Sequence, residues 1–196
     1  MNKRYRKLVG GLLLSATLLI GGTSLLAFGS AQAQAEAALP VTVIRVLDGD
    51  TVEVAGHSGT IRLASLDAPE AAHGFGKPGQ PFSMAATEYL RAQLINVPGV
   101  TMICVDRDTK YGRDVCELFR NGRSINRQLV AVGLAWANTS ARGRYLRDKQ
   151  LIGIQEQARV AKKGLWAQDS ARAPATPPWE WRDQCWRQGV CLVPQQ

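Results

Sequence analysis

The fold is decided by Ile61-Arg-Leu-Ala-Ser-Leu-Asp-Ala-Pro-Glu70, a stretch that begins as a strand and ends as a turn. Arg62 interrupts its apolar run, and two carboxylates follow on either side of Pro69. Because proline fixes its own φ and disfavours a helical residue before it, Asp67 and Glu70 leave the strand end at defined angles. One arginine beside two carboxylates suits phosphate-ester chemistry, although the alternative is an ordinary turn, since Asp and Pro both favour turns.

Strand and turn signals precede this stretch. Residues 41–47 and 51–54 are β-rich runs that flank Asp48-Gly49-Asp50. Asp-Gly between two such runs predicts a hairpin. A second turn at residues 56–59 leads into a predicted strand over residues 60–66, so we expect a three-stranded meander here.

Helix and strand patterns alternate beyond it. Apolar residues at helical spacing predict helices over residues 82–95, 125–132 and 145–163. Two β-rich runs, at residues 100–105 and 115–119, predict a further hairpin around a polar loop. The fold class predicted from these patterns is α+β.

The N-terminus has the layout of a secretory signal peptide. Cations at residues 3–7 precede a run of almost entirely apolar or small residues at 8–28, and residues 31–35 offer two small-x-small cleavage sites. We therefore predict a signal peptide over residues 1–35 and a secreted or periplasmic protein. The alternative is an uncleaved membrane anchor, because the apolar run is long enough to cross a bilayer.

The chain is basic. Its 196 residues carry 24 Lys and Arg against 16 Asp and Glu, for a formal net charge of +8. Four of these cations lie in residues 3–7, so the chain without them has a formal net charge of +4. A basic exported domain is compatible with a polyanionic substrate or a membrane surface, and the length suits one domain with a real core.

Four cysteines follow residue 40: Cys104, Cys116, Cys185 and Cys191. An even number without a CxxC pair, in a chain that begins like an exported protein, favours disulfides over a metal cluster. Of the three pairings that four cysteines allow, we prefer Cys104 with Cys116 and Cys185 with Cys191. The first pair lies on the two strands of the hairpin predicted over residues 100–119, where the two cysteines would be opposite each other in a suitable register. The alternative is two separate thiols.

The chain ends in a tryptophan-rich tail. Residues 171–178 hold three prolines and predict a linker, which separates a domain at residues 36–170 from a tail at 171–196. Three tryptophans follow the linker: Trp179, Trp181 and Trp186. We expect the tail to pack back on the domain with a local disulfide holding it; the alternative is stacking on nucleic acid.

Short motifs occur in a fixed order along the domain: Asp48-Gly-Asp-Thr-Val52, Ile61-Arg-Leu63, Leu66-Asp-Ala-Pro-Glu70, Lys110-Tyr-Gly-Arg113, Ile125-Asn-Arg-Gln-Leu-Val-Ala-Val-Gly-Leu-Ala135 and Lys163-Gly-Leu-Trp166. In order and approximate spacing they resemble the staphylococcal (thermonuclease-like) nuclease family, over about residues 41–168. The tail sequence Pro178-Trp-Glu-Trp-Arg182 is also similar to one that many bacterial members carry.

This resemblance implies a five-stranded OB-type β-barrel with three α-helices, and a Ca²⁺-dependent nuclease that hydrolyses phosphodiester bonds of DNA and RNA, with internal or terminal cleavage left open. By position, Asp50 and Asp67 correspond to the calcium carboxylates. Ala68 stands where the family often has threonine, whose ligand is the backbone carbonyl. Glu70 corresponds to the residue that activates or positions the attacking water.

The remaining site residues implied by the resemblance carry positive charge or an aromatic ring. Arg62 and Arg113 correspond to the pair that holds the scissile phosphate. Lys110 and Tyr111 lie where the family contacts the nucleotide, and Asp48 lies near the metal. We expect a monomer that needs no organic cofactor.

Two rival hypotheses stay open from the sequence. The first is an inactive OB-type module of the cell envelope that only binds nucleic acid; against it, all the residues that the catalytic and metal-binding roles require are present. The second is an envelope-anchored scaffold, held by an uncleaved N-terminus and the tryptophan-rich tail.

Overall fold

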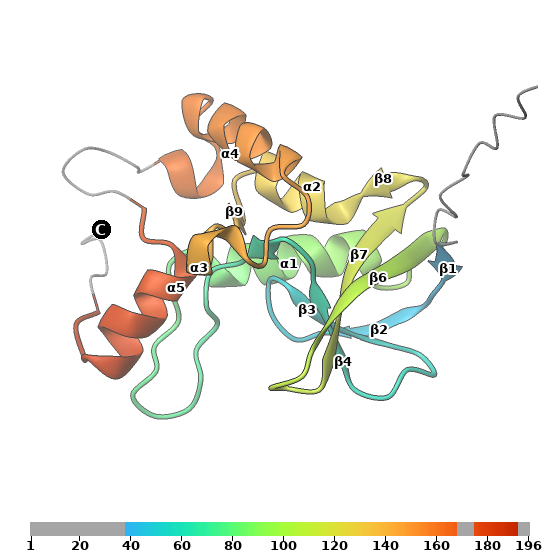
Figure 1. Ribbon diagram of the computed structural model, residues 1–196, viewed down its shortest axis with the longest axis horizontal. Coiled ribbons are helices and arrows are strands. Elements are labelled where there is room, and N and C mark those ends of the chain that lie inside the picture. Colours follow the sequence, from blue (N-terminus) through green and yellow to red (C-terminus); the bar gives the residue numbers. More distant parts are fainter. Residues whose placement is uncertain (1–37, 168–174, 192–196) are drawn as a thin grey trace, which may run out of the picture. The chain divides into compact units, whose positions relative to one another are not determined.

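The computed structural model describes residues 38–167 and 175–191 (Figure 1). The signal peptide predicted over residues 1–35 therefore lies outside the described residues. The strands are β1 Leu39–Pro40, β2 Val43–Val46, β3 Thr51–Val54, β4 Thr60–Leu63, β5 Leu66–Asp67, β6 Val100–Asp108, β7 Arg113–Arg120, β8 Arg123–Ser124 and β9 Trp136–Ala137. The helices are α1 Ser83–Leu94, α2 Ile125–Ala131, α3 Ser140–Gly143, α4 Gln150–Val160 and α5 Pro178–Trp181, with a 3₁₀ turn at Gly164–Ala167 and a π-helical turn at Arg182–Arg187.

One mixed sheet carries most of the strands. Its order is β1-β6-β7-β4-β3-β2, with β8 on β7, and β5 pairs with β9 in a separate two-stranded sheet. The neighbours are antiparallel except for β4 and β7, which run parallel. The α+β prediction is thus confirmed. Because β1 and β2 end the sheet, the pairing of the described strands does not close it into the predicted barrel.

The predicted third strand, residues 60–66, is wrong in extent. It splits into β4 and β5, because Ser65 between them has a left-handed φ of 67°. The Ser65 hydroxyl accepts hydrogen bonds from the backbone N–H groups of Arg147 and Asp148, each at 3.0 Å. The helix predicted over residues 145–163 is shorter than expected: it begins only at Gln150, whose backbone N–H donates to the Asp148 side chain at 3.1 Å, and it ends at Val160.

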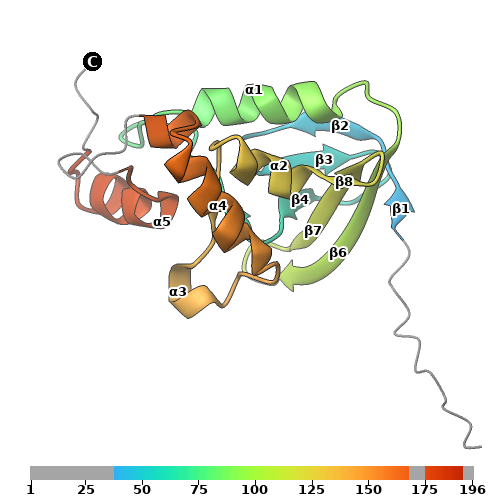
Figure 2. The ribbon, with the colours of Figure 1, turned by 90° about the horizontal axis from the view of Figure 1, so that it is seen from above.

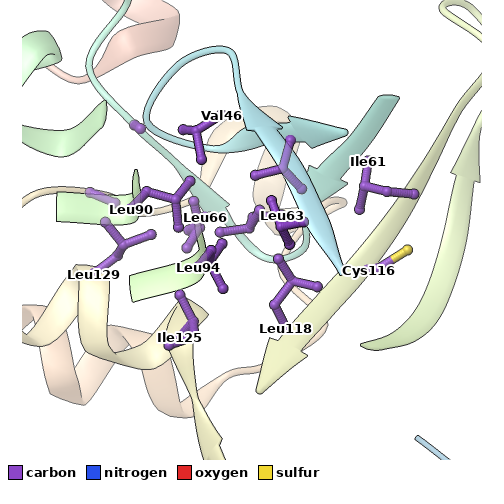
Figure 3. Packing of buried hydrophobic residues seen from close by; sticks show 14 of the residues in the cluster. Val46, Ile61, Leu63, Leu66, Leu90, Leu94, Cys116, Leu118, Ile125 and Leu129 are labelled. Atoms are coloured by element: carbon purple, nitrogen blue, oxygen red, sulfur yellow. The ribbon is translucent and has the colours of Figure 1, made fainter. Parts of the chain in front are cut away.

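The main core lies between the sheet and two helices. Leu90 and Leu94 come from α1, and Ile125 and Leu129 come from α2 (Figure 3). They pack against buried strand residues, among them Val46, Ile61, Leu63, Leu66, Cys116 and Leu118. In Figure 2, α1 runs alongside β2, and α2 and α4 lie next to each other. These contacts fix the strand ends that carry the candidate site.

A second, smaller cluster receives the C-terminal residues. It consists of Trp136, Ala158, Leu165 and Trp166, with Trp179 of the tail packed against it. Next to this cluster, the backbone at Gly133 lies close to the backbone at Lys163. The approach is possible because Gly133 has no side chain: a Cβ there would lie 2.2 Å from the carbonyl oxygen of Lys163. The expectation that the tail packs on the domain is confirmed for residues 175–191.

Both predicted disulfides form. Cys104 and Cys116 are directly opposite in the β6–β7 hairpin, and Cys185 bonds to Cys191. None of the described helices combines the length and the apolar character that a membrane crossing requires.

Candidate active site

Two buried aspartates lie side by side although 16 residues separate them. Asp50 follows the tight turn between β2 and β3, where its N–H donates to Asp48 Oδ1 at 3.0 Å. Asp67 ends β5. The exposed fractions of the two residues are 2% and 0%. The backbone N–H of Ala68 donates to Asp50 Oδ2 at 2.8 Å, which joins the two segments directly.

Gly49 makes this approach sterically accessible. A Cβ built on it would lie 2.7 Å from the Cβ of Ala68 and 2.8 Å from the Cβ of Ala86 in α1. Real side-chain atoms do not approach so closely, so any larger residue would push the hairpin turn away from β5. The Asp-Gly-Asp sequence therefore does more than form a turn: its glycine lets both carboxylates enter one site.

Arg62 bridges the two aspartates. It lies on β4, opposite Thr51 of β3, and its guanidinium donates from Nη1 to Asp50 Oδ1 and from Nη2 to Asp67 Oδ1. Burial acts to lower the pKa of Arg62, but Asp50 and Asp67 outweigh it and raise the pKa, so the arginine stays charged.

Around the buried Asp50 and Asp67, the carboxylates outnumber the cationic side chains. Burial raises the pKa of the Asp50 carboxyl well above its usual range; Arg62 opposes this, whereas Asp48 and Asp67 add to it. Such mutual repulsion is relieved by a bound cation. In the described part of the chain, no three His, Cys, Asp or Glu side chains converge on one point as a metal cluster. Any cation here would therefore depend on two carboxylates with carbonyl or water oxygens.

Glu70 is fixed through its backbone. Its N–H donates to the side-chain oxygen of Gln80 at 3.2 Å, and its carbonyl accepts from the Gln80 backbone N–H at 2.7 Å. These two bonds close the loop of residues 71–79 at its base. Burial raises the pKa of the Glu70 carboxyl, while Arg182 lowers it.

Arg113, Lys110 and Tyr111 form a neighbouring group at the β6–β7 turn. The cationic groups of Arg113 and Lys110 lie 4.8 Å and 4.9 Å from the centre of the exposed Tyr111 ring. Arg62 is in register with Val115, so Arg113, two residues before it, faces the same side of the sheet as Arg62. The ion pair of Arg113 is with Asp108 at 2.9 Å, not with the aspartate cluster.

Two further residues at the site were not predicted from the sequence. Arg182 donates to Glu70 and Asp67, and Gln80 holds the Glu70 backbone. The only sequence signal for Arg182 was its place at the end of the Pro178-Trp-Glu-Trp-Arg182 motif. Gln80 carried no signal, because it sits in a loop rich in glycine and proline.

Known proteins resemble this chain over the same region. Residues 60–168 match the family model described as staphylococcal nuclease homologue. The chain belongs to this family. A relative in Escherichia coli O157:H7, named an uncharacterized endonuclease, is 34% identical over 143 residues, which cover 71% of this chain and 82% of the relative. A micrococcal nuclease of Shigella flexneri is 32% identical over 149 residues, which cover 71% of this chain and 78% of that protein.

Membership of the staphylococcal nuclease homologues identifies the protein as a nuclease-type hydrolase. The family match spans Arg62, Asp67, Glu70 and Arg113, whereas Asp50 and Arg182 lie outside it. The structure nevertheless joins both of these residues to the matched part by hydrogen bonds.

Proposed function

We propose that this protein is an exported, Ca²⁺-dependent nuclease that hydrolyses phosphodiester bonds of DNA and RNA. The observation that carries the proposal is the cluster formed by Asp50, Arg62, Asp67 and Glu70. Two buried carboxylates, a bridging arginine and a third carboxylate beside them have the composition of a phosphoryl-transfer site.

The donor set fits a hard divalent cation. Asp50, Asp67 and the Ala68 carbonyl would hold Ca²⁺, which prefers oxygen ligands and keeps room for waters and phosphate. Burial raises the pKa of Asp50, and the negative charges of Asp48 and Asp67 add to this effect; a bound cation would favour the ionised carboxylates, which supports this assignment. When bound, such an ion supplies charge stabilisation for the phosphate.

The side chains of the protein itself take the remaining roles. Glu70 accepts the proton of the attacking water, and its raised pKa suits a general base better than an ordinary exposed carboxylate would. Arg62 and Arg113 bind the scissile phosphate and stabilise the charge that develops on it. Lys110 and Tyr111 contact the nucleotide next to that phosphate.

Further parts of the proposal concern the whole protein. Relatives named as endonucleases support internal cleavage. We interpret β2, β3, β4, β6 and β7, the strands of four or more residues, as the strands of an OB-type barrel, and α1, α2 and α4 as its three helices. We also propose a monomer without an organic cofactor, secreted or periplasmic, with an uncleaved N-terminal anchor as the alternative.

The test is digestion of circular single-stranded DNA and of RNA by the exported chain, with Ca²⁺ and with chelator. We expect both substrates to be cut only with Ca²⁺, and the circular DNA shows that the cuts are internal. If the protein retards both substrates on a gel and leaves them intact with Ca²⁺, it is the rival binding module instead. Mass spectrometry of the exported protein separates the secreted form, which starts near Gln34 or Glu36, from the anchored form.

A further inference from the structure

We propose that Arg182 is a positioning residue of the active site, which holds the Glu70 carboxylate beside Asp67 in the arrangement that hydrolysis needs. Arg182 belongs to the C-terminal segment, residues 175–191, which lies beyond residues 60–168 that match the family model. The role rests on the proposed nuclease function and adds a residue from outside the matched domain to its site.

The guanidinium of Arg182 spans the two carboxylates. Its Nη1 donates to Glu70 Oε1, and its Nη2 donates to Asp67 Oδ2 at 2.9 Å. The side chains of Asp67 and Glu70 are 1% and 15% exposed and that of Arg182 is 38% exposed, so the carboxylate ends of these bonds are shielded from solvent while the guanidinium is partly exposed. Because the guanidinium is planar and rigid, one arginine that bonds both groups fixes their separation and orientation. Glu70 Oε2 accepts from no described group and can receive a water.

The C-terminal segment holds Arg182 as a packed element. Trp181 before it and Cys185 after it are 2% and 1% exposed. Trp179 packs on the cluster of Trp136 and Trp166. Trp186 donates through Nε1 to the carbonyl of Pro78 at 3.1 Å, so the segment also lies against the loop that follows Glu70. In Figure 1, α5 lies next to that loop. An anchored backbone places the guanidinium reproducibly, as a positioning residue requires.

The segment reaches Glu70 by a second route. Gln80 is only 5% exposed and bonds both backbone groups of Glu70. Its remaining amide donor, Nε2, bonds the carbonyl of Thr176 in the segment at 2.5 Å. The segment thus holds the side chain of Glu70 through Arg182 and its backbone through Gln80.

The net charge of the site is consistent with Arg182 staying bonded to Glu70 and Asp67 when a metal ion is bound. The carboxylates of Asp48, Asp50, Asp67 and Glu70 carry four negative charges, and Arg62 and Arg182 carry two positive charges. The remaining charge of −2 is balanced by one divalent cation. Without Arg182, Glu70 would lose the guanidinium that bonds it to Asp67, and of the two arginines only Arg62 would remain to offset the repulsion between these carboxylates.

The test compares Arg182→Ala, Arg182→Lys and Arg187→Ala with the wild-type protein. Arg187 is the matched control, because it lies on the same segment and carries the same charge, but it is exposed and, among the described residues, its ion pair is with Asp183. The readouts are kcat and KM on single-stranded DNA at saturating Ca²⁺, thermal unfolding, and Ca²⁺ affinity by calorimetry. If Arg182→Ala does not fold, Arg182→Gln is measured by the same criteria.

We expect Arg182→Ala to lower kcat by about 10- to 100-fold, the cost of a misplaced catalytic group, with KM changed less than about 3-fold. Arg182→Lys should recover part of the loss, since an ammonium keeps the charge without the fork. Arg187→Ala should match the wild type. A wild-type rate in Arg182→Ala overturns the proposal, as does a raised KM with unchanged kcat, which indicates substrate contact only.

Two other outcomes have distinct meanings. Faster cleavage and tighter Ca²⁺ binding by Arg182→Ala would show that the guanidinium blocks Asp67, and the positioning role would be wrong. If the wild-type protein itself cuts neither substrate with Ca²⁺, the proposed function fails, and the positioning role fails with it.

Discussion

Gly49 shows how a single residue determines whether the site exists. The turn that carries Asp50 touches Ala68 and Ala86 at distances that leave no room for a Cβ. Asp50 accepts the Ala68 N–H and Arg62 only while the turn lies against β5. The stability of the turn and the geometry of the site therefore depend on the same contact.

At this scale we predict that Gly49→Ala destabilises the protein by about 1–3 kcal/mol, the usual cost of overpacking. Unfolding in urea measures the loss. Gly153→Ala is the matched control: nothing lies within 4 Å of a Cβ at this position in α4, so the change should be neutral or stabilising. Equal free energies of unfolding for the two variants would contradict the steric argument.

The C-terminal segment shows how an element outside the sheet completes the site. Two of its tryptophans differ in their surroundings. Trp181 is buried, whereas Trp186 lies half-buried against Pro78 and near His73 and Lys77 of the loop. Burial of Trp181 therefore anchors the segment, and Trp186 adds a contact at its edge.

For this element we predict that Trp181→Ala lowers the free energy of unfolding by about 3–5 kcal/mol, as expected for truncation of a buried aromatic residue. Trp186→Ala, the same substitution five residues later, should cost clearly less, because that side chain keeps part of its surface in water. Urea denaturation followed by circular dichroism measures both. An equal or larger loss for Trp186→Ala would mean that the loop contact, not the buried face, holds the segment.

At the scale of the whole molecule, the sequence allowed prediction of those features that depend on residues close together in the chain. The hairpins, the α+β class and the Cys104–Cys116 bond follow from turn residues and strand patterns, and the motif order indicated which carboxylates meet. The break at Ser65 did not follow, because its hydroxyl bonds to N–H groups 82 and 83 residues away. Arg182 was missed for the same reason, since it lies 112 positions along the chain from Glu70.

A stability measurement on the intact protein tests the metal assignment. Only the folded protein brings Asp50 and Asp67 together, so Ca²⁺ should bind the native state and stabilise it. At a concentration 100 times the dissociation constant, the gain is about 2.7 kcal/mol. We expect Tm to rise with Ca²⁺ and to fall back with chelator, while NaCl at equal ionic strength has no such effect. A Tm that does not respond to millimolar Ca²⁺ would contradict the assignment.

The central claim is that Glu70, held in the cluster of Asp50, Arg62 and Asp67, takes the proton of the attacking water. The most direct test is the kcat of Glu70→Gln on single-stranded DNA at saturating Ca²⁺, with Glu117→Gln as control. Burial raises the pKa of Glu117 as it does that of Glu70, but Glu117 lies outside the cluster. We predict that Glu70→Gln lowers kcat by about 10²- to 10⁴-fold and that Glu117→Gln leaves it unchanged. Wild-type kcat in Glu70→Gln would contradict the account.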